Sequence, residues 1–171
     1  NTDDCIKNKY INKDEFPLEI ASNQLIKDKI NILHTIGGDD TNTTALELVK
    51  YLKTKNYTLT VVGLPKTIDN DIYPIAQSLG AYTAAEQSAI FFKNIVNENT
   101  TSSRQLIIHE VMGRNCGWLT AYSAYIYQKE MLKKTKFLPN IGLLKEKWEI
   151  HAIYIPEVNF NLINEVKRLK K

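Results

Sequence analysis

Hydrophobic and polar positions along the chain fall into alternating helical and strand patterns. Apolar residues recur with helical spacing over residues 17–29, 45–53, 79–95, 118–132 and 160–170. Runs rich in strand-forming residues lie at 30–36, 58–64, 105–111 and 149–155. Strands that alternate with helices predict a three-layer α/β fold, with a mostly parallel sheet and helices on both faces.

Two parts of the chain lack such a pattern. Residues 1–16 show no strong periodicity, so we expect a poorly structured segment there and one domain over residues 17–171. Residues 138–148 also read as irregular, with a short helix after Leu143 as the one candidate element. No internal repeat divides the chain further.

Composition excludes several classes of function. The 171 residues are 24% charged with a net charge of +3, and the lysines are spread along the chain, so we expect solvated helix faces and no nucleic-acid partner. No apolar run approaches the roughly 18 residues needed to cross a bilayer, and no signal peptide is visible, so no membrane partner is expected. Cys5 and Cys116 form no metal-type pair, and a reducing, cytoplasmic location fits them.

Candidate chemistry gathers where the predicted strands end. The first strand runs into Gly37 and Gly38, which let the backbone approach a ligand, and then into Asp39 and Asp40 at the start of a helix. Free N–H groups and the helix dipole would make an anion site there, with Thr41–Thr43 as N-cap residues. The carboxylates could hold a hard cation such as Mg²⁺, or they could simply cap the helix.

The other strand ends add charges of both signs. Lys66, Asp69 and Asp71 follow the second strand, Arg114 follows the third and Glu157 the fourth. Ligands of parallel sheets bind beyond the carboxyl ends of the strands, so these groups are expected to share one site. Cations for anionic groups and a carboxylate to accept a hydroxyl proton suit phosphoryl transfer.

Four motifs resemble the 6-phosphofructokinases in order and spacing. They are GGDDT from Gly37, PKTIDND from Pro65, EVMGRNCGW from Glu110 and IPEV from Ile155. The resemblance covers about residues 21–168 and implies a Rossmann-like phosphofructokinase fold. It also implies transfer of a phosphoryl group to the 1-hydroxyl of fructose 6-phosphate in glycolysis, by a homo-oligomer.

The resemblance also implies roles for individual residues. Asp69 would accept the proton of the sugar hydroxyl, Asp71 would support the charged site, and Asp39 would bind Mg²⁺. The donor would lie against Gly38 and Lys66. The sugar phosphate would be contacted by Thr67, Ile68, Asp69, Met112, Gly113, Arg114 and Glu157.

Two positions indicate diphosphate as the donor. ATP-dependent members usually carry Gly where this chain has Asp40, and a small residue where it has Lys66. Asp40 would repel the α-phosphate of ATP, and Lys66 would place positive charge near the diphosphate. Asp40 and Lys66 therefore join Asp69 and Asp71 in the predicted catalytic set.

The chain also departs from the family pattern. It lacks the N-terminal strand with a Gly-rich donor turn and the segment beyond the Pro-Glu motif, so we expect an incomplete phosphofructokinase domain. Arg104 is the nearest match to an arginine that reaches a neighbouring subunit. An alternative is a non-catalytic or truncated remnant that binds sugar phosphate or a partner subunit, and an ATP-dependent kinase of the same fold is disfavoured by Asp40 and Lys66.

Overall fold

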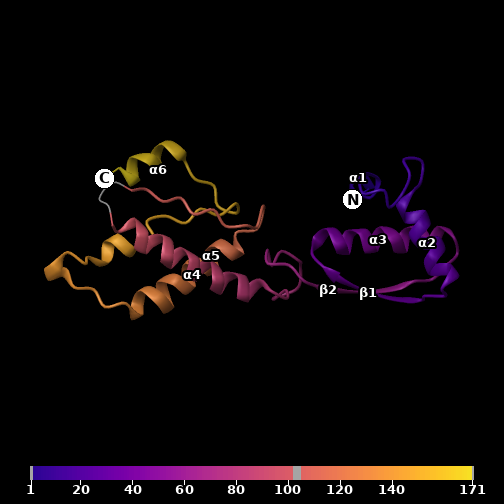
Figure 1. Cartoon of the computed structure of the whole chain (residues 1–171), viewed down its shortest axis with the longest axis horizontal. Helices are drawn as coiled ribbons and strands as arrows, with labels where there is room; N and C mark the ends of the chain where they lie inside the picture. Colours follow the sequence, from indigo (N-terminus) through magenta and orange to yellow (C-terminus); the bar gives the residue numbers. More distant parts are fainter. Residues whose placement is uncertain (1, 102–104, 171) are drawn as a thin grey trace. The chain divides into compact units, whose positions relative to one another are not determined.

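A computed structural model describes residues 2–101 and 105–170. These residues divide into two compact units, with the boundary between Lys66 and Thr67. Figure 1 shows both units, and each is described by itself below. Within the described ranges, no helix combines the length and the apolar character needed to cross a bilayer.

The first unit is built on a parallel pair of strands. Strand β1 (Ile32–Gly37) pairs with β2 (Thr60–Pro65), so that Ile32 lies opposite Thr60 and Gly37 opposite Pro65. Helix α3 (Asp39–Thr54) connects the strands, and α2 (Pro17–Lys27) packs on α3. A short helix, α1 (Thr2–Lys7), precedes them. The strands predicted at 30–36 and 58–64 are thus confirmed, each displaced by one or two residues.

The core of this unit lies between α3 and one face of the sheet. Leu48, Leu52 and Leu59 are buried, and Leu33 and Val61 of the strands pack against them. The opposite face carries residues that stay exposed within the described chain, namely Ile32, Ile36, Val62 and Leu64. The α/β class is therefore confirmed, with helices over one face of the two strands in this unit.

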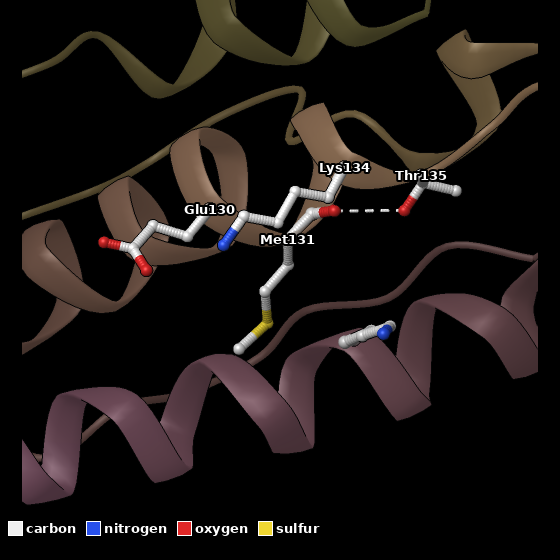
Figure 2. Close-up of a pocket in the computed structure, with 5 residues that line it drawn as sticks. Glu130, Met131, Lys134 and Thr135 are labelled. Atoms are coloured by element: carbon white, nitrogen blue, oxygen red, sulfur yellow. Dashed lines mark hydrogen bonds between the residues drawn. The ribbon is translucent and has the colours of Figure 1, made fainter.

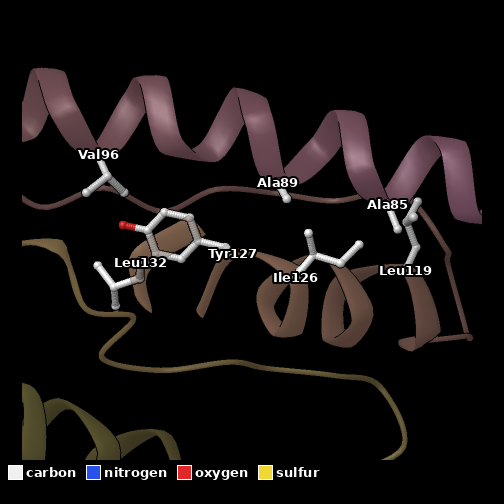
Figure 3. Close-up of a cluster of buried hydrophobic side chains, with 7 residues drawn as sticks. All are labelled: Ala85, Ala89, Val96, Leu119, Ile126, Tyr127 and Leu132. Carbon is white, nitrogen blue, oxygen red and sulfur yellow. The ribbon is translucent and has the colours of Figure 1, made fainter. Parts of the chain in front are cut away.

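The second unit is centred on two long helical segments. Helix α4 (Ala81–Asn99) packs against α5 (Trp118–Ile126), which continues through the π-helical turn η1 (Tyr127–Met131) and the 3-10 turn η2 (Leu132–Lys134). Figure 3 shows the buried side chains between them, which are Ala85, Ala89, Val96, Leu119, Ile126, Tyr127 and Leu132.

Small residues on α4 allow this close approach. Ala81, Ala85 and Ala89 recur every four residues and are each 0% exposed, so they form one face of the helix. Their packing partner is the α5–η1 segment. Residues 118–132 are helical as predicted.

Two predicted strands are not paired. Residues 105–111 and 149–155 take part in no β-ladder among the described residues, and the sheet contains only β1 and β2. Their side chains still differ by face: Val111 and Ile150 pack against the helical core, while Leu106 is 81% and Ile108 86% exposed. The strands predicted at 105–111 and 149–155 are therefore wrong among the described residues, because a strand also needs a hydrogen-bonded neighbour.

The end of the second unit combines short turns and one helix. The 3-10 turns η3 (Pro139–Ile141) and η4 (Lys145–Trp148) occupy the segment expected to be irregular. Helix α6 (Leu162–Leu169) follows, and Asn161 caps it by accepting a hydrogen bond of 3.0 Å from the N–H of Asn164. This is the helix predicted over residues 160–170.

Candidate active site

The carboxyl ends of β1 and β2 meet in the first unit. Gly37 lies opposite Pro65, and the N–H of Lys66 donates to the carbonyl of Gly37 over 2.8 Å. The backbone of Lys66 is therefore adjacent to the turn that leads into Asp39. The Lys66 residue is exposed, so it is accessible to a ligand.

The turn after β1 brings two carboxylates to the start of α3. Gly38 is the N-cap residue, and Asp39 and Asp40 are exposed in the first turn of the helix. Carboxylates are favoured there by the helix dipole. The N-cap predicted at Thr41–Thr43 is wrong because the helix starts directly after Gly38, and those residues already lie within it.

Gly37 has a packing role that the sequence did not indicate. A Cβ atom at this position would collide with the side chain of Thr41. Nearby, Asn42 Nδ2 donates to the carbonyl of Gly38 over 2.8 Å. The glycine therefore allows α3 to leave the strand at close range, whereas the prediction had assigned this freedom to ligand approach.

Asp39 and Asp40 suit a divalent cation that is coordinated by protein carboxylates together with substrate phosphates. The described residues contain no group of three or more His, Cys, Asp or Glu side chains that could hold a metal ion. Mg²⁺ is usually bound through one or two carboxylates, together with water and substrate phosphates. Two adjacent exposed carboxylates match that donor set.

In the second unit, hydrogen bonds order the segment from Thr67 to Ser78. The N–H of Asp69 donates to Thr67 Oγ1 over 3.2 Å. Asn70 has a positive φ of 55°, and its Oδ1 accepts from the N–H of Ser78 over 2.8 Å. Ile68, for which the resemblance implies a substrate contact, packs against the helical core.

Asp69 is distinguished by one unused oxygen atom. Its Oδ1 is buried and has no hydrogen-bond partner among the described residues. The other such side-chain oxygens belong to Ser22, Thr35 and Asn99, so Asp69 is the one carboxylate in this described set. A buried acceptor without a donor costs roughly 1–3 kcal/mol, and a ligand hydroxyl would relieve that cost.

A tight turn holds Arg114 after the segment 105–111. Gly113 and Arg114 have positive φ values of 144° and 47°, and the N–H of Cys116 donates to the carbonyl of Gly113 over 2.8 Å. A Cβ at Gly113 would collide with the carbonyl oxygen of Cys116. Arg114 and Met112 are exposed at this turn.

Glu157 connects that turn to the segment 149–155. Its Oε1 accepts from the N–H of Gly117 over 2.7 Å, at the N-terminus of α5. A Cβ at Gly117 would collide with the Cβ of Ile155 and lie 2.6 Å from Glu157 Oε2, so only glycine allows this approach. The ends of the third and fourth predicted strands therefore do meet, although neither segment is a paired strand.

The structure thus forms two groups of predicted site residues, one in each unit. Gly38, Asp39, Asp40 and Lys66 gather in the first unit. In the second unit, Glu157 bonds to Gly117, which follows Arg114 by three positions. Thr67 and Asp69 lie in the ordered 67–78 segment, where Asp71 is exposed. Arg104 lies outside the described residues. The sequence did not predict roles for Asn70, Ser78 and Gly117. The one signal that could have indicated such a role was the position of Asn70 between two Asp residues.

A pocket of the second unit does not involve these residues. It has a volume of about 350 Å³ and lies between α4 and the η1–η2 segment (Figure 2). Its lining residues are Lys93, Glu130, Met131, Lys134 and Thr135. Two of the lining residues are joined by a hydrogen bond, in which Thr135 Oγ1 donates to the carbonyl of Met131 over 3.0 Å.

Comparison with protein families decides the relationship. The family model described as phosphofructokinase matches residues 5–171. The chain belongs to the phosphofructokinase family. The resemblance seen in the four motifs is thereby confirmed over almost the whole chain.

Individual relatives are more specific than the family model. The chain is 54% identical over 171 residues to a pyrophosphate–fructose 6-phosphate 1-phosphotransferase of Methylomonas methanica, covering 100% of this chain and 42% of the relative. It is 51% identical over 170 residues to a protein of the same name from Mastigamoeba balamuthi, covering 99% and 41%. The chain therefore spans less than half the length of these relatives.

A solved phosphofructokinase shares the fold. The structure of Pichia pastoris phosphofructokinase in the T-state matches with a TM-score of 0.67 and 20% sequence identity, covering 90% of this chain and 14% of that chain. The incomplete phosphofructokinase fold predicted from the sequence is therefore confirmed.

Proposed function

We propose that the full-length protein containing this chain transfers a phosphoryl group from diphosphate to fructose 6-phosphate. In this reaction the 1-hydroxyl oxygen of the sugar attacks the terminal phosphorus of diphosphate. The P–O–P bond breaks, and the products are fructose 1,6-bisphosphate and orthophosphate. The relatives that share 50–54% of their aligned residues with the chain carry the name of this reaction.

The buried Oδ1 of Asp69 is the observation that carries the proposal. A general base must have a free lone pair within reach of the proton that it removes. Asp69 offers one on a segment ordered by hydrogen bonds, from its own N–H to Thr67 Oγ1 and from the N–H of Ser78 to Asn70 Oδ1. We assign to Asp69 the proton of the sugar 1-hydroxyl, which is released as the oxygen attacks phosphorus.

Lys66 and Asp40 would select the donor. Phosphoryl transfer is accelerated chiefly by positioning and by neutralising charge on the phosphate oxygens. Lys66, exposed beside the carboxyl end of β1, would stabilise the charge that develops on the departing orthophosphate. The carboxylate of Asp40 would repel the α-phosphate of ATP.

The remaining groups would bind the metal ion and the sugar phosphate and orient the substrates. Asp39 would hold a divalent ion, for which we propose Mg²⁺; bound there, this ion would neutralise charge on the diphosphate oxygens. Arg114 would pair with the sugar phosphate, because a guanidinium can bind phosphate through two hydrogen bonds. Thr67, Met112, Gly113 and Glu157 would complete the sugar-phosphate contacts, and Asp71 would support the charged site. A cytoplasmic location and homo-oligomeric assembly remain predictions.

A donor comparison on the full-length protein tests the proposal. We expect formation of fructose 1,6-bisphosphate from fructose 6-phosphate with diphosphate, at a kcat/KM at least tenfold above that with ATP. Binding of fructose 6-phosphate without turnover from either donor would instead support the alternative, a non-catalytic member that only binds sugar phosphate. Efficient turnover with ATP alone would contradict the assignment of the donor.

A further inference from the structure

The 67–78 segment contains a pair of residues for which the proposed reaction gives no role. Asn70 stands between two acidic residues, and Ser78 precedes helix α4. Ser78 is 1% exposed, which is unusual for a polar side chain. Both side chains are engaged in hydrogen bonds with the loop that carries Asp69.

Asn70 bonds across the loop through both ends of its amide. Its Oδ1 accepts from the N–H of Ser78 over 2.8 Å, and its Nδ2 donates to the carbonyl of Ala76 over 3.3 Å. The backbone of Asn70 has φ of 55°, in the left-handed region that Asn tolerates better than most residues. The side chain therefore stabilises a turn that would otherwise be strained.

Ser78 completes the connection on the other side of Asp69. Its hydroxyl donates to the carbonyl of Thr67 over 2.5 Å, and the same oxygen lies 3.1 Å from Asn70 Oδ1. A hydroxyl has one proton, so the shorter contact is the main hydrogen bond. Thr67 and Asn70, which flank Asp69 closely, are thus both tied to the residue that leads into α4.

We infer that Asn70 and Ser78 are positioning residues for Asp69, and this inference rests on the proposed function. Neither side chain touches the Asp69 carboxylate in any hydrogen bond of the described residues, so they act through the backbone. They fix the segment while leaving Asp69 Oδ1 unpartnered. A misplacement of about 1 Å can lower turnover about 100-fold, so this restraint should matter for catalysis.

Variants of Asn70 separate the side-chain bonds from backbone strain. Asn70→Gly tolerates the positive φ but removes both amide bonds, whereas Asn70→Asp keeps an oxygen that can accept from the N–H of Ser78. Ser78→Ala removes the bond to Thr67. Asn56→Gly is the matched control, because Asn56 also has a positive φ, of 56°, and its side chain makes no hydrogen bond among the described residues.

We expect kcat of the full-length protein with diphosphate to fall about 10- to 100-fold in Asn70→Gly and Ser78→Ala. The KM for fructose 6-phosphate should stay within threefold, because the binding groups remain. Asn70→Asp should recover most of the loss, and Asn56→Gly should behave as the parent protein. Hydrogen exchange over residues 67–70 should be faster in the two impaired variants only.

Two results would overturn the inference. One is kcat within twofold of the parent in both Asn70→Gly and Ser78→Ala, in a protein that does use diphosphate. The other is unchanged hydrogen exchange over residues 67–70 in those variants. If the parent protein shows no turnover with diphosphate, the proposed function fails, and the exchange measurement still decides whether the pair orders the Asp69 segment.

Discussion

At the scale of single residues, backbone features rather than ion pairs determine where the charged side chains of the candidate site lie. Asp39 and Asp40 stand at a helix N-terminus, Arg114 stands on a tight glycine turn, and Lys66 follows a paired strand. None of these four takes part in an ion pair among the described residues, where the ion pairs join other side chains. Their charges are therefore available to ligands.

Replacing Asp40 and Lys66 together should change the preferred donor. In the full-length protein, Asp40→Gly with Lys66→Gly removes the repulsion of the ATP α-phosphate and the cation for diphosphate. We expect the ratio of kcat/KM for ATP to that for diphosphate to rise at least tenfold, measured by fructose 1,6-bisphosphate formation.

The matched control makes the same two changes in the exposed loop after α1, as Asp14→Gly with Lys13→Gly. This control should leave the donor ratio unchanged. A ratio that fails to rise in the Asp40 and Lys66 variant would exclude these residues as the basis of donor choice.

The residues that sequence reasoning missed share a physical cause. Asn70 and Ser78 lie eight positions apart, and their pairing depends on how the chain folds back between them. Glu157 and Gly117 lie 40 positions apart and meet at 2.7 Å. No local pattern encodes such contacts, whereas Lys66, Asp69 and Arg114 were identifiable because each follows a predicted strand directly.

At the scale of elements, α6 is attached to the segment before it by a small charged network. Glu165 accepts from Tyr154 over 2.7 Å and from Arg168 over 2.6 Å, and Arg168 also donates to the carbonyl of His151 over 3.0 Å. The hydrogen bond from Arg168, followed by that from Tyr154, lowers the pKa of Glu165 from 4.5 to about 2. The network therefore depends on an ionised Glu165.

This network predicts a pH dependence with a defined sign. Since the pKa of Glu165 is lower in the folded state, its stabilising contribution is complete above pH of about 4.5 and declines as pH falls toward 2. We expect the melting temperature of the parent to exceed that of Glu165→Gln at pH 6, and the difference to shrink steadily between pH 4.5 and 3.

A second variant controls for the loss of a carboxylate. Glu149→Gln breaks the exposed pair of Glu149 with Lys145, which are 2.9 Å apart, and exposed pairs contribute little to stability. Its melting temperature should follow that of the parent at each pH. A difference between the parent and Glu165→Gln that does not vary with pH would contradict the role assigned to Glu165.

The alanine face of α4 gives a prediction about packing. Ala89 is 0% exposed against α5 and η1, so Ala89→Leu must displace neighbours and should destabilise the protein by about 1–3 kcal/mol. Gln87→Leu adds a leucine at an exposed position of the same helix and is the control. Thermal unfolding should show a lower midpoint for Ala89→Leu alone; equal midpoints would mean that this interface is loosely packed.

The elements also show which patterns predict structure reliably. The segments predicted at 30–36 and 58–64 form strands because they pair with each other, and α3 connects them. Residues 105–111 have an equally good strand pattern but remain unpaired among the described residues. Periodicity reports which face of a segment is buried, while pairing depends on a neighbour that periodicity does not reveal.

At the scale of the whole molecule, the chain is shorter than half the length of the relatives that it matches. It spans 42% of the Methylomonas methanica relative, and its two described units each carry one group of candidate site residues. The fold class and the family could be predicted from the sequence, because alternating helix and strand patterns and the four motifs can be recognised without knowing the tertiary structure. The donor, base and metal roles are proposals for the full-length protein.

The most direct test concerns Asp69 in that full-length protein. Asp69→Asn keeps the shape of the side chain and removes its ability to accept the sugar proton. We predict that kcat with diphosphate falls by about 100- to 10,000-fold, as expected for loss of a general base, while the KM for fructose 6-phosphate stays within threefold. Turnover of Asp69→Asn within tenfold of the parent would contradict the assignment of Asp69 as the proton acceptor.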